Sequence, residues 1–383
     1  KHDTADERLS VTGLRLDHPV ATMSGDMDLG LADGDIEARL TLAQRSPEAF
    51  ARLLGLERAQ QVHVAVEATG TLPRPEVTVV GEAGSVAVAG FAATGLRLRA
   101  AAVPAGAGWR FDARADSDRL VSEDPRTAPL LGGNAGLEIA GQSQREGGLT
   151  LDRIALALPT ARLEGRARFD PATGAGSAPL ALAVSDLRTL AGWTGLELAG
   201  GADLELDLAR ASGDDSLQMS FAGTTRELAV DVPVLRALVS PVSRLAGVLI
   251  LDQDDGLTLR DLRLVGARAT AAASLRIPAG FDRLLGDVAV EAPDASVLDG
   301  ELGLSLTGPA RAAGRLDGPL SDPGLTGTLT VAGLGAGPFA WRDPAVRYEL
   351  ARLASGITGP VELTLPDPAA ETPQTPASAD APA

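Results

Sequence analysis

Residues that could perform catalysis are few in this chain and stand apart from one another. Its 383 residues include three histidines and no cysteine, which excludes disulfides, thiolate catalysis and cysteine-based metal sites. His2, His18 and His63 have no motif partner nearby, and the chain contains no G-x-S-x-G, P-loop or G-x-G-x-x-G motif. His63 alternates with valines, which places it on the polar side of a strand. The sequence therefore predicts a protein that is not an enzyme, with no catalytic residues and no cofactor.

One acidic cluster has the composition of a cation site but lacks its spacing. Asp252, Asp254 and Asp255 precede Gly256, as at the start of a calcium-binding loop. Such a loop needs a glutamate at its twelfth position, where this chain has Arg263. We therefore predict a hairpin turn at this point and no metal site.

Composition narrows the classes of partner. The formal net charge of −17 argues against nucleic acid and against an anionic membrane face, because both attract clustered Lys and Arg. Apolar residues make up 45% of the chain but aromatic residues only 3%. Compact cores usually rely on aromatic anchors, so this balance favours a smooth aliphatic lining; codon bias of a GC-rich genome is the other explanation.

The elements that must position any site are strands. Apolar and polar residues alternate with period two at 36–42, 62–66, 203–208 and 325–331. Similar runs occur at 96–100, 109–113, 163–169, 217–221, 271–277, 302–306 and 361–365. This alternation is typical of antiparallel strands with one solvated face. At the usual spacing of all-β chains, roughly 20 to 27 strands are expected.

An internal repeat organises these strands. Residues 148–217 align with residues 256–325 without a gap: Gly148-Leu149-Thr150-Leu151 matches Gly256-Leu257-Thr258-Leu259, and Asp186 and Leu190 match Asp294 and Leu298. The alternation slips by one residue within each copy, after Leu151 and after Leu259. A single inserted residue predicts a β-bulge or tight turn at each slip.

Helical patterns are short. Ser46-Pro47-Glu48 opens a helix that is expected to run to about Leu56. Residues 186–193 and 294–298 predict equivalent short helices in the two repeat copies, and residues 232–245 predict a further helix, interrupted by Pro241. Residues 366–383 are rich in Pro, Ala and acid, which predicts a disordered tail after a continuous β segment over 1–365.

A recurring Gly-Pro motif carries a family resemblance. Gly318, Leu320, Pro323, Leu325, Gly327 and Leu329 fit a pattern close to G-x-L-x-x-P-x-L-x-G-x-L, which the TamB family of AsmA-like envelope proteins repeats. Gly70, Leu72, Pro75 and Val77 fit its first part, but Val79 and Val80 replace the later glycine. Gly148–Leu156, Gly256–Leu264 and the Leu130–Gly133 segment are also similar to the family. The resemblance spans roughly 30–350, and its weight lies in the recurrence, since each motif is degenerate.

The resemblance implies a β-taco, a long antiparallel sheet curled into an apolar groove. It also implies a periplasmic protein tethered to the inner membrane by a segment absent from this chain. Such proteins are linked to outer-membrane biogenesis, lipid transport between membranes and partnership with an Omp85-type barrel. The chain lacks the family's anchor and its barrel-contacting C-terminal domain, so the resemblance implies an interior segment.

We therefore expect an all-β, elongated, mostly antiparallel curled sheet built from repeats, with a few short helices, that binds phospholipid acyl chains. Two alternatives stay open: an assembly factor that pairs its sheet edges with nascent outer-membrane proteins, and a structural β array with a filled core. The predicted lining of the lipid groove is Leu149, Leu151, Ile154, Leu156, Leu204, Leu206, Leu208, Leu257, Leu259, Leu262 and Leu264.

Overall fold

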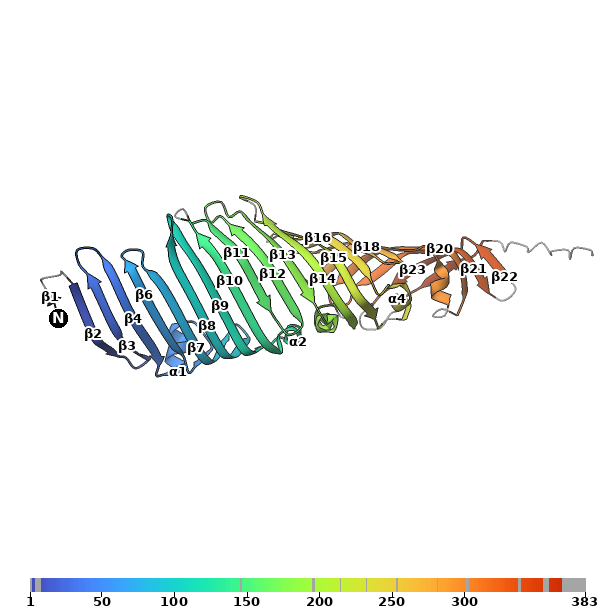
Figure 1. The fold of residues 1–383 in the computed structure, drawn as a ribbon. Coiled ribbons are helices and arrows are strands. Elements are labelled where there is room, and N and C mark those ends of the chain that lie inside the picture. The colour runs from blue at the N-terminus through green and yellow to red at the C-terminus, as the bar shows by residue number, and fades with distance from the viewer. Residues whose placement is uncertain are drawn as a thin grey trace, which may run out of the picture. The chain divides into compact units, whose positions relative to one another are not determined.

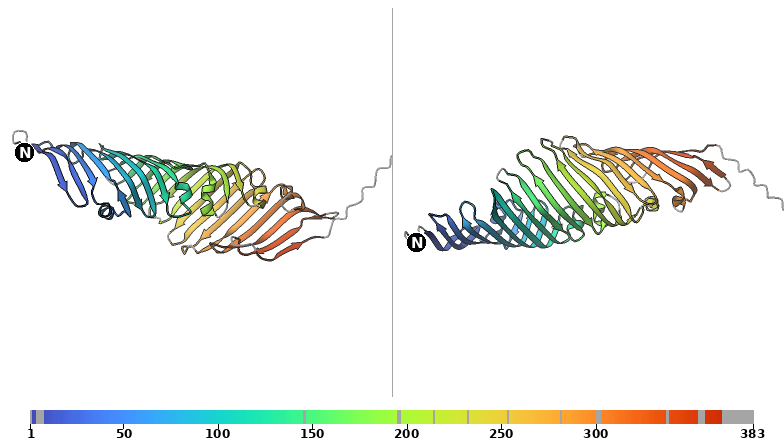
Figure 2. Two further views of the ribbon diagram at one scale, coloured as in Figure 1. Left: turned by 90° about the horizontal axis from the view of Figure 1, so that it is seen from below. Right: turned by 45° about the horizontal axis from the view of Figure 1, so that its top comes forward.

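The chain is an all-β protein whose helices are all short (Figure 1). The computed structural model describes residues 2–3, 8–144, 147–194, 197–213, 215–231, 233–252, 254–280, 282–299, 303–336, 339–353 and 358–366. These residues form 24 strands, within the number expected from the sequence. The predicted disordered tail lies outside the described residues, apart from residue 366. The strands twist and curl progressively within each part of the chain, as antiparallel sheets do (Figure 2).

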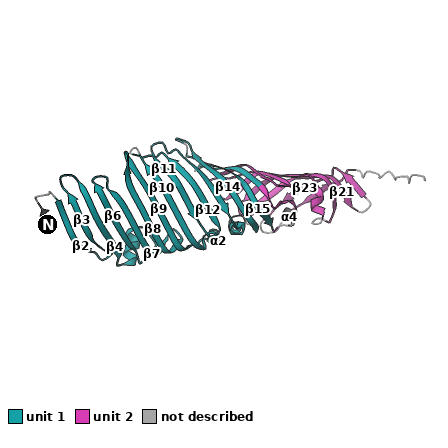
Figure 3. Ribbon diagram, viewed as in Figure 1, with its two compact units in different colours: residues 1–230, 244–255 teal, residues 231–243, 256–383 magenta. Residues whose placement is uncertain are grey.

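The chain divides into two compact units (Figure 3). Unit 1 comprises Lys1–Val230 and Arg244–Asp255, and unit 2 comprises Asp231–Ser243 and Gly256–Ala383. The strand β16 (Ser243–Asp252) begins at this division.

Unit 1 is an antiparallel meander in which each strand pairs with the next, except that β4 pairs with β6 and the short β5 pairs with β7. Short turns explain this order, because neighbours in sequence then become neighbours in the sheet. Its strands are β1 (His2–Asp3), β2 (Arg8–Asp17), β3 (Ala21–Gly30), β4 (Asp35–Gln44), β5 (Arg58–Gln60), β6 (His63–Thr71), β7 (Glu76–Val88), β8 (Phe91–Ala105), β9 (Gly108–Ser122), β10 (Gly133–Ser143), β11 (Leu149–Ala157), β12 (Ala161–Phe169), β13 (Gly176–Val184), β14 (Leu198–Arg210) and β15 (Leu217–Val230).

Unit 2 is a second antiparallel meander. Its strands are β17 (Gly256–Val265), β18 (Thr270–Ile277), β19 (Arg283–Ala292), β20 (Ser305–Pro319), β21 (Gly324–Ala336), β22 (Phe339–Arg342), β23 (Ala345–Leu350) and β24 (Val361–Thr364). The long β21 pairs with β20 on one side and with both β22 and β23 on the other. The strand predicted at 302–306 begins only at Ser305, because Gly303 is in a left-handed conformation in a turn closed by its N–H on Asp299.

The two repeat copies contain the same elements in the same order. Both copies contain four strands and one 3-10 helix, η1 (Leu187–Leu190) in the first and η2 (Ala295–Leu298) in the second, and in the first copy a further turn of helix, Ala191–Thr194, follows η1. Asp186 and Asp294 cap these helices by accepting the backbone N–H two residues ahead. The predicted slips are β-bulges: the register shifts between Leu151 and Ile154, and between Leu259 and Leu262.

The helices of unit 1 lie at one end of its strands, along a border of the sheet that we call the helix edge. The register puts the ends of β4, β9 and β13 at this edge, where α1 (Pro47–Leu53), α2 (Ala128–Leu131), η1 and α3 (Ala191–Thr194) follow them. Figure 1 shows α1 and α2 along it. The opposite edge, where β3, β6, β8 and β10 end, carries turns and is called the turn edge.

The helix predicted over residues 232–245 is shorter than expected. α4 covers Pro233–Leu238, and the chain is already a strand from Ser243. Pro241 cannot donate a helical hydrogen bond, and the buried Ser240 accepts the backbone N–H groups of Ala267 and Arg268 instead. Likewise, α1 ends at Leu53, short of the expected Leu56, before Gly55 adopts a left-handed conformation.

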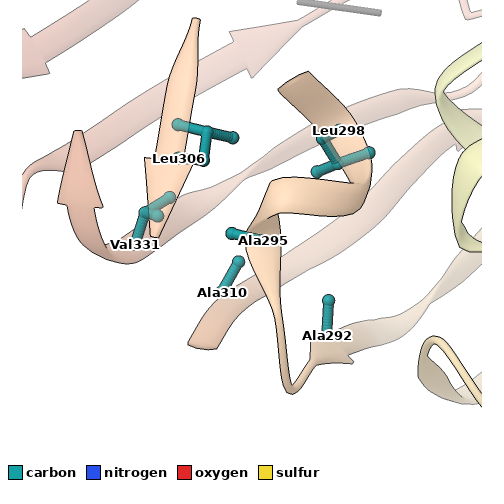
Figure 4. Packing of buried hydrophobic residues seen from close by; sticks show 6 residues of the cluster. All are labelled: Ala292, Ala295, Leu298, Leu306, Ala310 and Val331. Atoms are coloured by element: carbon teal, nitrogen blue, oxygen red, sulfur yellow. The ribbon is translucent and has the colours of Figure 1, made fainter. Parts of the chain in front are cut away.

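Fully buried apolar side chains form three small clusters. In unit 1, Phe50 of α1 packs on Leu42 and Val62, and Leu187 of η1 packs with Val184 and Ala202. In unit 2, the short helix η2 packs in the same way (Figure 4), and its cluster contains Ala292, Ala295, Leu298, Leu306, Ala310 and Val331. The helices therefore cover one end of an apolar sheet face.

Candidate functional site: the apolar face of the sheet

One face of unit 1 carries apolar residues in direct register across its strands, from β2 to β15. Two cross-strand rows contain only apolar residues and glycine, and we call them ladders 1 and 2. Ladder 1 is Leu16, Met23, Leu42, Val64, Gly81, Leu98, Ala115, Leu137, Leu156, Leu163, Leu182, Leu204 and Gly223. Ladder 2 is Leu14, Gly25, Leu40, Val66, Val79, Ala100, Ala113, Ile139, Ile154, Gly165, Leu180, Leu206 and Phe221.

These ladders are partly open to solvent. Leu16 and Leu98 are 56% and 38% exposed, and every other Leu, Ile and Val of the two ladders is half-buried. Side chains in a filled sandwich core would be closed off by the facing layer. Among the described residues, full burial of large apolar side chains is concentrated beneath the short helices. The face is therefore an exposed apolar surface with a wall along one edge.

Unit 2 has the same construction. Ladder 3 is Leu264, Ala271, Val290, Ala312, Leu329, Val346 and Leu363. Ladder 4 is Leu262, Ala273, Val288, Gly314, Gly327, Tyr348 and Val361, and ladder 5 is Leu259, Leu275, Gly286, Leu316, Leu325 and Leu350. The apolar face therefore occurs in both units.

The eleven residues predicted to line a groove are all half-buried. Leu156 and Leu204 belong to ladder 1, Ile154 and Leu206 to ladder 2, and Leu259, Leu262 and Leu264 to the ladders of unit 2. Leu149, Leu151, Leu208 and Leu257 lie opposite Phe169, Ala167, Met219 and Ile277, in shorter rows on the same faces. Their role as a lipid lining stays a prediction.

The bulges keep these leucines on one face. In β11, Leu151 pairs with Gly141 and Arg153 with Ala140, so Asp152 is the extra residue. In β17, Arg260 and Asp261 occupy the bulge, and Asp261 has a φ of 52°. If the strand were regular here, with no bulge to absorb the extra residue, the leucines after this point would face the polar side. The slip seen in the sequence therefore preserves the apolar face.

Glycines make room for leucines along the ladders. A Cβ on Gly165 would lie 2.4 Å from the carbonyl oxygen of Pro179 and 2.6 Å from Cδ2 of Leu180. A Cβ on Gly327 would lie 2.6 Å from the hydroxyl of Tyr348, which donates to the carbonyl of Ala313. The neighbouring large side chain thus leans over each glycine and covers its backbone.

The opposite face of unit 1 is polar and carries cross-strand ion pairs. Arg114 contacts Asp116 at 2.8 Å and Glu138 at 3.0 Å, and Arg153 contacts Glu138 at 2.8 Å. The hydrogen bond from Arg114 lowers the pKa of Asp116, and Asp116 in turn raises the pKa of Arg114. The two arginines are more than half exposed, at 61% and 63%, and solvent screens these pairs, so they contribute little to stability.

Two open hollows of about 540 and 680 Å³ also lie over β12–β14. Short residues such as Ala181 form their floors between longer charged side chains, including Glu164 and Glu205. Within the described part of the chain, no group of three or more His, Asp or Glu side chains is arranged to hold a metal ion. Asp252 accepts the N–H groups of Asp254 and Asp255, which is the predicted turn.

The described helices include none with the length and hydropathy needed to cross a bilayer.

A partly open apolar recess of about 120 Å³ lies at the helix edge of unit 1. Phe50 of helix α1 and Leu54, the residue after the helix, line one side, and Val64, Gly81 and Leu98 of ladder 1 line the other. Sequence reasoning missed this recess, although the amphipathic pattern of α1 offered a signal for an apolar contact with a sheet. It also missed the N-terminal members of ladders 1 and 2. The sequence showed on which face of its strand each of these residues lies, but it did not show which residues of the neighbouring strands lie opposite.

In comparisons with protein-family models, curated proteins and solved structures, no match to this chain was found.

Proposed function

We propose that this chain binds phospholipid acyl chains on its apolar face and conducts lipid along it. The observation that supports this proposal is the pair of uninterrupted, half-exposed ladders from β2 to β15. Exposed apolar patches larger than a few hundred Å² usually mark a binding surface. Nonspecific apolar contact suits a hydrocarbon chain, because aliphatic side chains in register impose no directional requirement.

The energetics are adequate for a mobile lipid. Complete burial gains about 0.8 kcal/mol per methylene, and an open face covers about half of each chain. A sixteen-carbon chain would therefore gain on the order of 6 kcal/mol, before ordering costs. Such binding is strong enough to populate the face and weak enough to permit movement.

The TamB-like motifs at Gly70–Val77 and Gly318–Leu329 support a proposal for the cellular setting. In both motifs the glycine is the penultimate residue of a strand and has a positive φ, and the proline precedes the next strand. We propose a TamB-like periplasmic segment that carries lipid between inner and outer membranes. Partnership with an Omp85-type barrel would involve regions outside this chain.

Lipid bound to the purified chain tests the proposal, with a matched pair of variants in unit 2. Leu325 belongs to ladder 5, whereas its neighbour Thr326 is exposed on the polar face. Native mass spectrometry and uptake of fluorescent phosphatidylethanolamine from vesicles should show lipid on the wild type and on Thr326→Asp, and at least tenfold less on Leu325→Asp. Wild-type protein that carries no lipid in either assay would refute the proposal.

A further inference from the structure

The recess under α1 has the size and chemistry of a site for the end of a hydrocarbon chain. Its volume is about 120 Å³, and its accessible lining is apolar throughout. An engineered apolar cavity that binds benzene measures ~150 Å³, so this recess is of the size that accepts a small apolar group. At a volume per methylene close to the ~30 Å³ of a water molecule, it holds about four carbons of an unbranched chain.

The recess is continuous with the apolar face. Val64, Gly81 and Leu98 are consecutive members of ladder 1 and also line the recess. Because Gly81 has no side chain and Leu98 is 38% exposed, these two residues leave the recess open toward the rest of the apolar face. Phe50 of α1 and Leu54, which directly follows α1, form the wall.

We propose that this recess binds the methyl end of an acyl chain, while the rest of the chain lies along the strands toward the turn edge. The proposal rests on the lipid-binding function above and specifies how the lipid is oriented there. From Gly81 to Glu76, where β7 begins at the turn edge, five residues span about 17 Å at ~3.4 Å per residue. One leaflet of a bilayer is about 15 Å of hydrocarbon, so an acyl chain covers this distance. Its headgroup then lies among the solvated turns.

A filling variant tests the site without disturbing the backbone. A Cβ on Gly81 would meet Cβ of Leu98 at 3.7 Å and Cγ2 of Val64 at 3.8 Å, which are ordinary contacts, so Gly81→Leu fills the recess. Val80→Leu is the matched control, because Val80 is the adjacent residue of β7 and is exposed on the polar face.

The probes are two phosphatidylethanolamines, one with a diazirine on the terminal carbon of a sixteen-carbon chain and one with a diazirine on the headgroup. After irradiation of the full chain, peptide mapping should place the terminal probe on residues 50–64 and 81–98 and the headgroup probe elsewhere. Gly81→Leu should reduce terminal labelling there at least tenfold, and Val80→Leu should leave it unchanged.

Each of the other outcomes would contradict either the recess as a chain-end site or lipid binding itself. Three results would show that the recess is not a chain-end site, although lipid binding itself would remain supported. They are terminal labelling spread evenly over the apolar face, headgroup labelling inside the recess, and full terminal labelling of Gly81→Leu. Wild-type protein that neither probe labels refutes lipid binding itself. If Gly81→Leu does not fold, the labelling pattern of the wild type still shows whether the end of the acyl chain binds in the recess.

Discussion

The substitution Leu206→Asp separates an open lipid-binding face from a closed core. Leu206 lies between Leu180 and Phe221 in ladder 2 and is half-buried. Full burial of a leucine is worth about 1.5–3 kcal/mol, so its contacts contribute about 1 kcal/mol, and aspartate in a strand costs up to about 1 kcal/mol more. On an open face water solvates the carboxylate, and the free energy of unfolding falls by only about 2 kcal/mol.

Leu206→Asp should reduce the affinity for lipid far more than it reduces the free energy of unfolding. An acyl chain that covers this position must desolvate the carboxylate, and a penalty of ~3 kcal/mol or more lowers affinity by about 100-fold. Urea denaturation would measure the first effect, and exchange of fluorescent phosphatidylethanolamine the second. Glu205→Leu is the control, because Glu205 is exposed on the opposite face. A loss above about 4 kcal/mol would indicate a closed core. Normal lipid uptake by Leu206→Asp would show that lipid does not pass this position.

Two further predictions concern the supports of the apolar face. Gly165→Ala should lower the free energy of unfolding by about 1–3 kcal/mol, because its Cβ would press on the Pro179 carbonyl at 2.4 Å; Gly81→Ala, which meets only ordinary contacts, should unfold in urea like the wild type. The backbone N–H of Arg188 lowers the pKa of Asp186, and that of Ser296 lowers the pKa of Asp294, from the usual 3.8. Their contribution to stability is therefore complete above about pH 4 and is lost as the pH falls through the lowered folded-state pKa values. The double variant with Asp186→Asn and Asp294→Asn should show a shallower fall in melting temperature on acidification. An unchanged acid profile would mean that the caps do not titrate with folding.

Local rules in the sequence were sufficient for most of the strands, for the short helices of the two repeat copies and for the bulges. The one-residue slips after Leu151 and Leu259 have a local cause, and the Asp caps of η1 and η2 use only residues within one turn. The misjudged boundaries have a non-local or loop-specific cause. Ser240 leaves the helical pattern because it binds the Ala267–Arg268 backbone, which is distant in sequence. Gly303 delays β20 through a turn closed by Asp299.

The ladders were only partly predictable, because alternation gives the face of a residue but not its cross-strand neighbour. Leu42 and Leu156 belong to the same ladder, although five strands of the ladder lie between theirs, and their register depends on every intervening turn and bulge. The recess beneath α1 was less predictable still. It requires Phe50, from a helix, to meet Gly81, from a strand that follows later in the chain.

The short helices cover only part of the apolar face, and this partial cover argues for a mobile occupant. A permanent protein layer would be expected to bury the ladders along their length, but the short helices cover them at one edge only. Glycines within the ladders, such as Gly165, let leucines lie flat over the backbone, and the five ladders contain only two aromatic residues, Phe221 and Tyr348, that could fix a ligand at one position. Half-exposed leucines in long rows also carry an aggregation hazard unless something covers them. A hydrocarbon chain that slides along the rows meets these requirements together, since it covers apolar area, needs no hydrogen-bond partner and leaves the turn edge free for a solvated headgroup.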